Sequence, residues 1–184
     1  MQEALANEPA PAGAAPDKLV IHVEGDAGGS WSMGFTGGKL AIDQGATAGA
    51  PLQVSMSTAD LRSFIAGEVR DAIKAKAGGR GTIDAKQMAK LFRVTNKTEQ
   101  VKAFSGDLQF RMEDAGKGKT YKITLTFGGG APNVAAPKTT ISMALSDFLA
   151  LIGGELNPQA AFFAGQIRLD GDMNLAMGLM ALAM

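Results

Sequence analysis

The sequence predicts an α/β fold of the α+β type, built from short strands, glycine-rich turns and a few short helices. Three observations indicate this fold class. Apolar and polar residues alternate along short runs, which is the period of a half-buried strand. Many of the 24 glycines stand between these runs, as they do in hairpin turns. Apolar residues recur at helical spacing directly after two of the runs, near residues 58–67 and 146–152.

The front half of the chain is predicted to contain four strands followed by one helix. Alternation marks the strands by their apolar residues: Leu19, Ile21 and Val23; Trp31, Met33 and Phe35; Leu40 and Ile42; Leu52, Val54 and Met56. The helix follows over about residues 58–67. Ahead of these elements, residues 1–17 mix Ala, Pro, Gly and Glu, which predicts a disordered leader. They have neither the positive start nor the apolar run of a signal peptide.

The back half is predicted to alternate strands and helices in a longer series. Gly153 and Gly154 end the first of its helices, and Asp172 is the predicted N-cap of the last. The predicted order is a strand at about 108–113, a glycine hairpin at 115–119, a strand at about 122–127, a Gly/Pro/Ala-rich loop at 128–137, a strand at about 139–143, a helix from Ser146, a short helix from Pro158, a strand with Ile167 and Leu169, and a final helix.

An internal similarity links the two halves. Residues 55–69 align without gaps on residues 142–156, at an offset of 87, with six identities in 15 positions. This pattern predicts two related units, a divergent one at 18–94 and a typical one at 97–184. Two alternatives stay open: chance similarity between two strand-to-helix transitions, and one domain with a long N-terminal extension of its sheet.

Composition excludes several classes of function. The 18 basic and 18 acidic residues cancel, and no long block of one sign supplies the positive patch that nucleic acid or an anionic membrane requires. With no cysteine, the chain lacks disulfides, thiolate metal sites and a cysteine nucleophile. Asp172 and Asn174 interrupt the closing apolar run, so no run reaches the roughly 18 residues of a membrane span. These observations predict a cytoplasmic protein without a nucleic-acid partner or an integral membrane segment.

The ionisable residues offer no catalytic or metal-binding constellation. His22, the only histidine, falls in a predicted strand, and no Gly-x-Ser-x-Gly motif presents a serine to it. Gly118-Lys119-Thr120 ends like a phosphate-binding loop, but Glu113 stands where that loop requires its first glycine. Asp170 and Asp172 lie at a predicted turn and cap. We therefore expect no enzyme, no cofactor and no metal.

The closing segment carries an ordered motif, in which Leu156-Asn157-Pro158 precedes Ala161, Phe162, Gly165 and then Gly171-Asp172-Met173. This motif resembles the closing segment of the sterol carrier protein type 2 domain, and the order of predicted elements agrees with that family over about residues 97–184. The resemblance implies a mixed, mainly antiparallel β-sheet with helices covering one face. It also implies an apolar tunnel along the last helix that accepts sterols, fatty acids or acyl-CoA.

The last helix has almost no polar face. Its methionines recur at intervals of four, three and four and share one face, beside a second stripe of leucines. The methionines are Met173, Met177, Met180 and Met184, and the leucines are Leu175, Leu179 and Leu182. A methionine face repacks around guests of different shape, although the same spacing is typical of an ordinary core.

These observations lead to one functional prediction with two alternatives. The chain is predicted to bind and transfer a hydrophobic ligand (sterol, fatty acid, acyl-CoA or phospholipid) without catalysis. The alternatives are a structural or protein-interaction module with a filled core, whose apolar helix docks on a second copy or another protein, and an accessory domain that presents lipid to an enzyme. The predicted apolar wall consists of Phe110, Met112, Leu125, Phe127, Met143, Phe148, Ile152, Phe162, Phe163, Ile167, Met173, Met177 and Met180.

Overall fold

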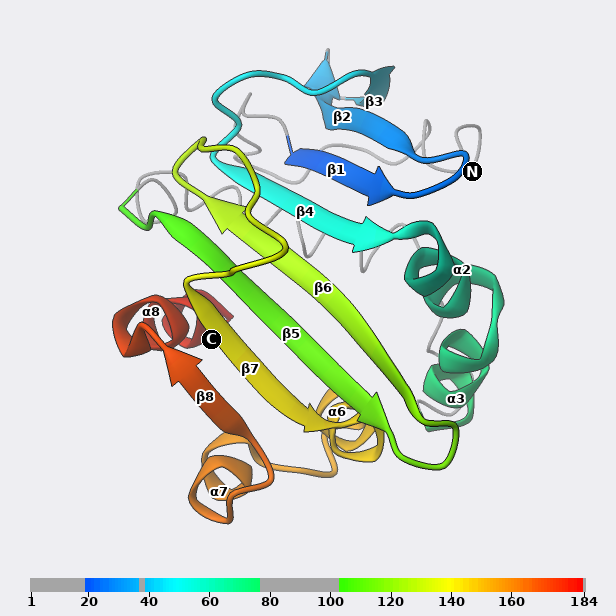
Figure 1. The fold of residues 1–184 in the computed structure, drawn as a ribbon, viewed down its shortest axis with the longest axis vertical. Helices are drawn as coiled ribbons and strands as arrows, with labels where there is room; N and C mark the ends of the chain where they lie inside the picture. The colour runs from blue at the N-terminus through cyan, green and yellow to red at the C-terminus, as the bar shows by residue number, and fades with distance from the viewer. Residues whose placement is uncertain (1–18, 37–38, 77–102, 184) are drawn as a thin grey trace.

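A single mixed sheet runs through both halves of the chain (Figure 1). The computed structural model describes residues 19–36, 39–76 and 103–183, and within them eight strands and five helices are present. The strands are β1 (Leu19–Glu24), β2 (Gly29–Thr36), β3 (Lys39–Gln44), β4 (Leu52–Ser57), β5 (Gly106–Asp114), β6 (Lys119–Phe127), β7 (Thr139–Ala144) and β8 (Arg168–Gly171). The helices are α2 (Thr58–Ala66), α3 (Glu68–Lys76), α6 (Leu145–Gly153), α7 (Pro158–Phe163) and α8 (Met173–Ala183).

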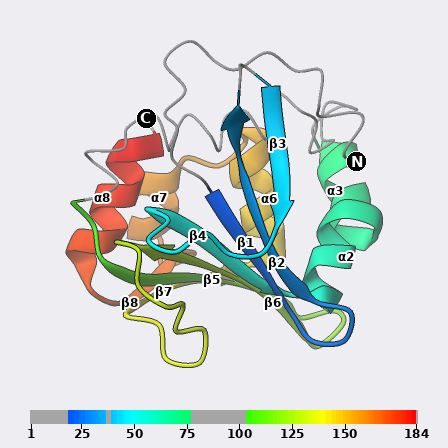
Figure 2. The same ribbon diagram turned by 90° about the horizontal axis from the view of Figure 1, so that it is seen from above.

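The strand order in the sheet is β3-β2-β1-β4-β6-β5-β7-β8. The pairs β1–β4 and β5–β7 are parallel, and the other neighbouring strands are antiparallel. The helices lie on one side of this sheet (Figure 2). The predicted α+β fold, with a mainly antiparallel sheet and helices covering one face, is therefore confirmed.

The alternating apolar residues of the strands bury one face of the sheet under the helices. Both halves contribute to the same core, because Leu52 of β4 and Leu108 of β5 belong to one cluster of buried side chains. Helices α2, α3, α6 and α8 contribute apolar residues to that cluster: Phe64, Val69, Ile73, Leu149, Leu175 and Ala176. Full burial of a leucine-sized side chain contributes roughly 1.5–3 kcal/mol, so this shared core holds the two halves together.

The internal similarity has a counterpart in the structure. At the offset of 87, β4 and α2 correspond residue for residue to β7 and α6. The pairings recur as well, since β1 and β5 each pair antiparallel with the next strand and parallel with the strand that precedes the helix. The division into units at 18–94 and 97–184 stays a prediction, and the predicted leader at 1–17 lies outside the described residues.

The Gly/Pro/Ala-rich loop between β6 and β7 lies on the face of the sheet opposite the helices (Figure 2). Three polar side chains of that face hold it. Gln53 Nε2 donates to the carbonyl of Gly130 at 2.6 Å, and Gln109 Nε2 donates to the carbonyl of Val134 at 2.9 Å. The carboxylate of Asp107 accepts from the backbone N–H of Asn133 at 3.1 Å. The loop is therefore remote from the helices that the expected tunnel would use.

A polar cluster fastens α3 to the hairpin of β5 and β6. Tyr121 is fully buried, and its hydroxyl donates to the carboxylate of Glu68, which also accepts from the ammonium of Lys117. The ammonium of Lys119 stands 4.3 Å from the centre of the Tyr121 ring. The hydrogen bonds from Lys117 and Tyr121 lower the pKa of Glu68, and the bond to Glu68 raises the pKa of Lys117.

We expect the stabilisation from this cluster to vanish at acid pH. Because the pKa of Glu68 is lower in the folded state, its contribution is present above the ordinary carboxyl range and is lost as the pH falls through the lowered value. Wild type should therefore melt at a higher temperature than Glu68→Gln at pH 7, and the gap should close below about pH 4. Thermal unfolding monitored by circular dichroism from pH 7 to pH 3 measures this gap. A gap that is constant with pH would contradict the assignment, and Glu113→Gln on the exposed end of β5 serves as control.

Candidate functional site

The helices α6, α7 and α8 belong to the last part of the chain, where the predicted ligand wall lies. Helix α8 contacts β5, β7 and β8, and α6 contacts β5 and β7. Helix α7 begins at Pro158 as predicted, and Asn157 caps it by accepting from the N–H groups of Gln159 and Ala160 at 2.9 and 3.1 Å. A buried Ala161 anchors this short helix.

The predicted wall residues separate into two environments. One set is buried or half-buried in the common core of sheet and helices: Phe110, Met112, Leu125, Phe127, Met143, Phe148 and Ile167. The other set is exposed on the helices: Ile152 at 47%, Phe162 at 41%, Phe163 at 87%, Met173 at 52% and Met177 at 54%. The side chain of Met180 lies outside the described residues. The fold therefore places part of the predicted wall in a packed core and leaves the rest uncovered.

Helix α8 turns its methionine face away from the sheet. Leu175 and Ala176 are buried against the strands, whereas Met173 and Met177, one turn apart, share the exposed side. On α7 the rings of Phe162 and Phe163 meet edge to face, with centroids 6.0 Å apart. The exposed apolar side chains of α7 and α8 are therefore candidates for a binding surface.

The start of α8 is fixed by contacts with the start of β7. Asp172 caps the helix, because its Oδ1 accepts from the N–H of Asn174 at 2.9 Å. Its other carboxylate oxygen lies 2.9 Å from the ammonium of Lys138. The hydrogen bonds from Lys138 and Asn174 lower the pKa of Asp172. Thr139, fully buried, exchanges two hydrogen bonds of 3.1 Å with the backbone of Asp172. These contacts hold α8 at one end of the candidate site.

Phe104 and Gly178 form a contact beneath α8 that the sequence analysis missed. A Cβ atom on Gly178 would lie closer than 3.0 Å to the ring of Phe104. That ring also packs edge to face on Phe127, with centroids 6.1 Å apart. A lone glycine inside an otherwise apolar helix was the available signal, since such a glycine often marks a close approach. Phe104 therefore belongs to the floor on which α8 rests.

Replacing Gly178 with alanine should destabilise the protein by about 1–3 kcal/mol, because the ring of Phe104 must move. In a Phe104→Leu background the same replacement should cost little, since the shorter side chain frees the space. A double-mutant cycle from urea unfolding measures the coupling, which we expect to be roughly 1–2 kcal/mol. Additive effects would show that the alanine methyl group does not meet the ring of Phe104.

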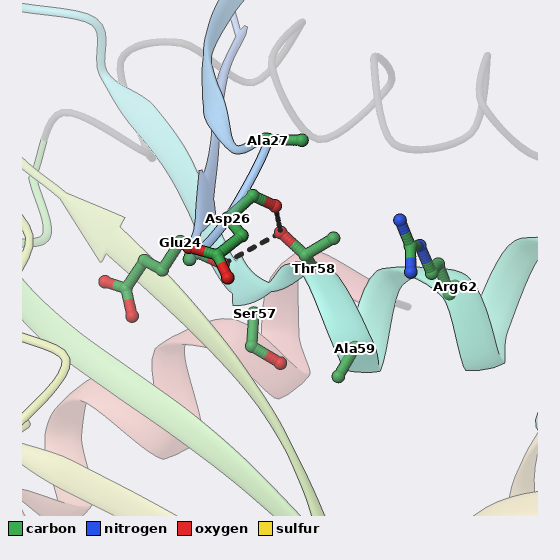
Figure 3. A pocket seen from close by; sticks show the side chains of 8 residues that line it. Glu24, Asp26, Ala27, Ser57, Thr58, Ala59 and Arg62 are labelled. Atoms are coloured by element: carbon green, nitrogen blue, oxygen red, sulfur yellow. Dashed lines mark hydrogen bonds between the residues drawn. The ribbon is translucent and has the colours of Figure 1, made fainter.

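Two pockets lie elsewhere on the described surface, and none of the predicted wall residues lines them. One, of about 400 Å³, borders the start of α2 (Figure 3) and is lined by Glu24, Gly25, Asp26, Ala27, Ser57, Thr58, Ala59 and Arg62. The Thr58 hydroxyl in it donates to the backbone carbonyl of Glu24 at 3.0 Å. The other, of about 310 Å³, is lined by His22, Val23, Glu24, Gly29, Ser30, Ser55 and Pro132.

His22 lies in a strand, β1, as predicted, and it is half-buried. Gln53 directs its NH₂ group to the carbonyl of Gly130, so its Oε1, 2.8 Å from His22 Nε2, accepts the proton of that nitrogen. His22 Nδ1 then accepts from the hydroxyl of Ser30 at 2.8 Å. Both ring nitrogens are therefore occupied within the protein. Within residues 19–36, 39–76 and 103–183, no group of three or more acidic or histidine side chains gathers as a metal site requires.

Comparison with known proteins adds a family match over more than half of the chain. Residues 85–184 match the model of the SCP-2 sterol transfer family. Sterol carrier protein 2 of Homo sapiens is 42% identical over 84 residues, which are 43% of this chain and 15% of that protein. The peroxisomal multifunctional enzyme A of Dictyostelium discoideum is 28% identical over 124 residues, covering 62% of this chain and 28% of the enzyme. The chain thus matches only a small part of the length of these relatives.

Solved structures of sterol carrier domains are similar as well. The sterol carrier protein domain 2 of Helicoverpa armigera is 31% identical, with a TM-score of 0.39 over 54% of this chain and 84% of that one. The apo form of sterol carrier protein 2 from Yarrowia lipolytica is 17% identical, with a TM-score of 0.39 over 64% of this chain and 88% of that one. None of the described helices is long and apolar enough to cross a membrane.

Proposed function

This chain belongs to the SCP-2 sterol transfer family, and from that premise we propose that α6, α7 and α8 form the wall of a lipid site that α8 closes. The ligand is a hydrophobic molecule of the size of a sterol, a fatty acid, an acyl-CoA or a phospholipid. The protein holds and transfers it without changing it. The proposal is specific to this side of the molecule, where the sheet is covered by helices (Figure 2).

The uncovered apolar side chains of α6, α7 and α8 are the observation that carries this proposal. Phe163 is 87% exposed, and Met173 and Met177 are about half exposed, although Ala161 of α7 and Leu175 and Ala176 of α8 are buried. Leaving such groups in water is unfavourable, and a lipid tail removes both its own methylenes and these side chains from water. Each buried methylene contributes roughly 0.8 kcal/mol, so a 14-methylene tail gains on the order of 11 kcal/mol before ordering costs.

The packed residues beneath these helices determine how a lipid tail is accommodated. Met112 and Met143 lie in the buried core under the helix layer, and methionine adapts its shape at low cost. A tail that lies along the exposed side chains of these helices and reaches into the core would displace contacts of such residues rather than fill an empty channel. A wall of this composition selects by size and shape and reads few polar features. We therefore expect binding of several lipid classes with modest selectivity.

An accessory role beside an enzyme is the second candidate. The match to the peroxisomal multifunctional enzyme A of Dictyostelium discoideum covers 28% of that protein, so a similar segment occurs there within a longer chain. The exposed Phe162 and Phe163 pair fits contact with another protein as well as with lipid. In this candidate the same site hands its lipid to a separate catalytic domain.

Native mass spectrometry of the freshly purified protein tests the proposal. We expect a stoichiometric adduct that solvent extraction identifies as a fatty acid, sterol or phospholipid, and displacement of a fluorescent fatty acid by the extracted lipid. A bare mass together with no uptake of the fluorescent fatty acid would contradict lipid carriage. Uptake of the fluorescent fatty acid by protein stripped of lipid distinguishes a lipid site that was purified empty from a protein that has no lipid site.

A further inference from the structure

Three basic residues form a row across the open face of the sheet, opposite the helices. Arg111 of β5 lies directly across from Lys122 of β6 and from Ser142 of β7, and Ser142 lies directly across from Arg168 of β8. Residues paired in this way point to the same face of a sheet. Their neighbours along the strands, such as Phe110 and Ile123, pack into the core on the other face.

The row contradicts the usual preference for opposite charges across strands. Arg111 and Lys122 carry like charges at directly opposed positions, which destabilises an antiparallel pair. The ion pairs of the described residues join Lys117 and Lys119 to Glu68, and Lys138 to Asp172, so none of them neutralises the row. Glu113 and Asp170 lie two positions along the strands on the same face, but neither forms an ion pair with the row. A like-charge arrangement without an ion pair within the described chain indicates a functional surface.

Arg111 is held in position by a buried neighbour. Its Nε donates to Oε1 of Gln109 at 2.7 Å. Gln109 is fixed in turn, because its Nε2 donates to the hydroxyl of Thr124 at 3.0 Å and to the carbonyl of Val134 at 2.9 Å. Only Nε of the guanidinium is used in this way, so the terminal Nη groups have no acceptor among the described residues. A guanidinium held like this binds a carboxylate through two parallel hydrogen bonds at a small entropy cost.

The loop of residues 128–138 shapes the approach to the row. It stands on the same face of the sheet (Figure 2), held by Gln53, Asp107 and Gln109. A flat surface such as a bilayer meets this loop before it meets the row. An extended segment lying across the strands avoids the loop. The four strands of the row span about 14 Å, the length of four or five residues of extended chain.

We propose that the row of Lys122, Arg111 and Arg168 is a docking site for an extended acidic segment of a partner protein. The charges of the row are complementary to such a segment, and its length is matched by a short run of acidic residues. The row lies on the face opposite the proposed lipid site, so a bound partner leaves α6, α7 and α8 free. This proposal does not depend on lipid binding.

Fluorescence anisotropy of a labelled hexaglutamate peptide at low ionic strength tests the docking site. The variant Arg111→Gln, Lys122→Gln, Arg168→Gln should bind the peptide at least about tenfold more weakly than wild type. A control with the same change of net charge, Arg62→Gln, Arg70→Gln, Lys74→Gln on α2 and α3, should stay within about twofold. Equal losses of peptide affinity in both variants would show that net charge alone causes the effect, and would overturn the proposal.

Two further measurements make the result decisive. Sedimentation with phosphatidylcholine vesicles containing phosphatidylserine tests whether the row binds a membrane instead of a protein. Vesicle binding that depends on the row, without peptide binding, would overturn the proposal. The melting temperature of the row variant should equal or exceed that of wild type, because the like charges are relieved. A lower melting temperature together with unchanged peptide affinity would show that the row is structural.

Discussion

A Gly171→Ala variant should lose about 2–5 kcal/mol of folding free energy, the largest effect that we expect from a single methyl group. Gly171 has a φ of +101°, a conformation that costs other residues roughly 1–3 kcal/mol. A Cβ atom there would also lie closer than 3.0 Å to the backbone carbonyl oxygen of Lys138. Unlike a flexible side chain, this carbonyl cannot move without shifting β7 against β8, because Gly171 pairs with Thr139.

Gly45 supplies the matched control for this replacement. Its φ is +106°, and a Cβ atom on it would meet nothing within 4 Å. Gly45→Ala therefore introduces the same kind of backbone strain without the clash and should cost only about 1–2 kcal/mol. Equilibrium urea unfolding of both variants measures the difference. Equal losses would show that the close approach of Gly171 to Lys138 does not exist.

Most strands could be predicted from the sequence because apolar and polar residues alternate along each of them. The predicted strands near residues 122–127 and 139–143 agree with β6 and β7, and Asp172 caps α8 as expected. Helix α3 was missed, since Gly67 was interpreted as the end of the preceding helix. The chain instead resumes a helix at Glu68, and buries Val69 and Ile73 one turn apart.

Pairing between strands could not be predicted, because alternation shows which residues share a face and not which strand lies beside which. The parallel pairs β1–β4 and β5–β7 therefore appear only in the structure. The same limit hid the row of Arg111, Lys122 and Arg168, whose members are distant in the sequence. Because the numbers of acidic and basic residues are equal, we expected no positive patch.

The surroundings of the predicted wall residues could be predicted only in part, for a related reason. Helical spacing placed Met173 and Met177 on one face of α8, but spacing cannot show whether that face meets the sheet or water. In the structure Leu175 meets the sheet and the methionines face outward. Phe104 was missed because it precedes β5 and belongs to no periodic run. The choice of lipid, the cytoplasmic location and a possible homodimer stay predictions.

Charging the methionine face of α8 should abolish most lipid binding while the fold persists. In Met177→Glu the carboxylate would lie against the apolar tail, and burying an unpaired charge is strongly unfavourable. We expect at least about a tenfold loss of affinity for a fluorescent fatty acid. Because Met177 is 54% exposed, the folding free energy should change by less than about 1 kcal/mol.

Asn174 provides the control for that experiment on the same helix. It is exposed, and its side chain is already polar, so Asn174→Glu adds the same charge without replacing an apolar contact. Fatty-acid titration and thermal unfolding of both variants separate the possible roles of the methionine face. Loss of binding in Met177→Glu alone, with both proteins folded, is the result that the proposed lipid site requires. Unfolding of Met177→Glu would assign the methionine face to the core. If both variants bound the fatty acid as tightly as wild type, the methionine face would not belong to the lipid site, and α6 and α7 would be the wall to test next.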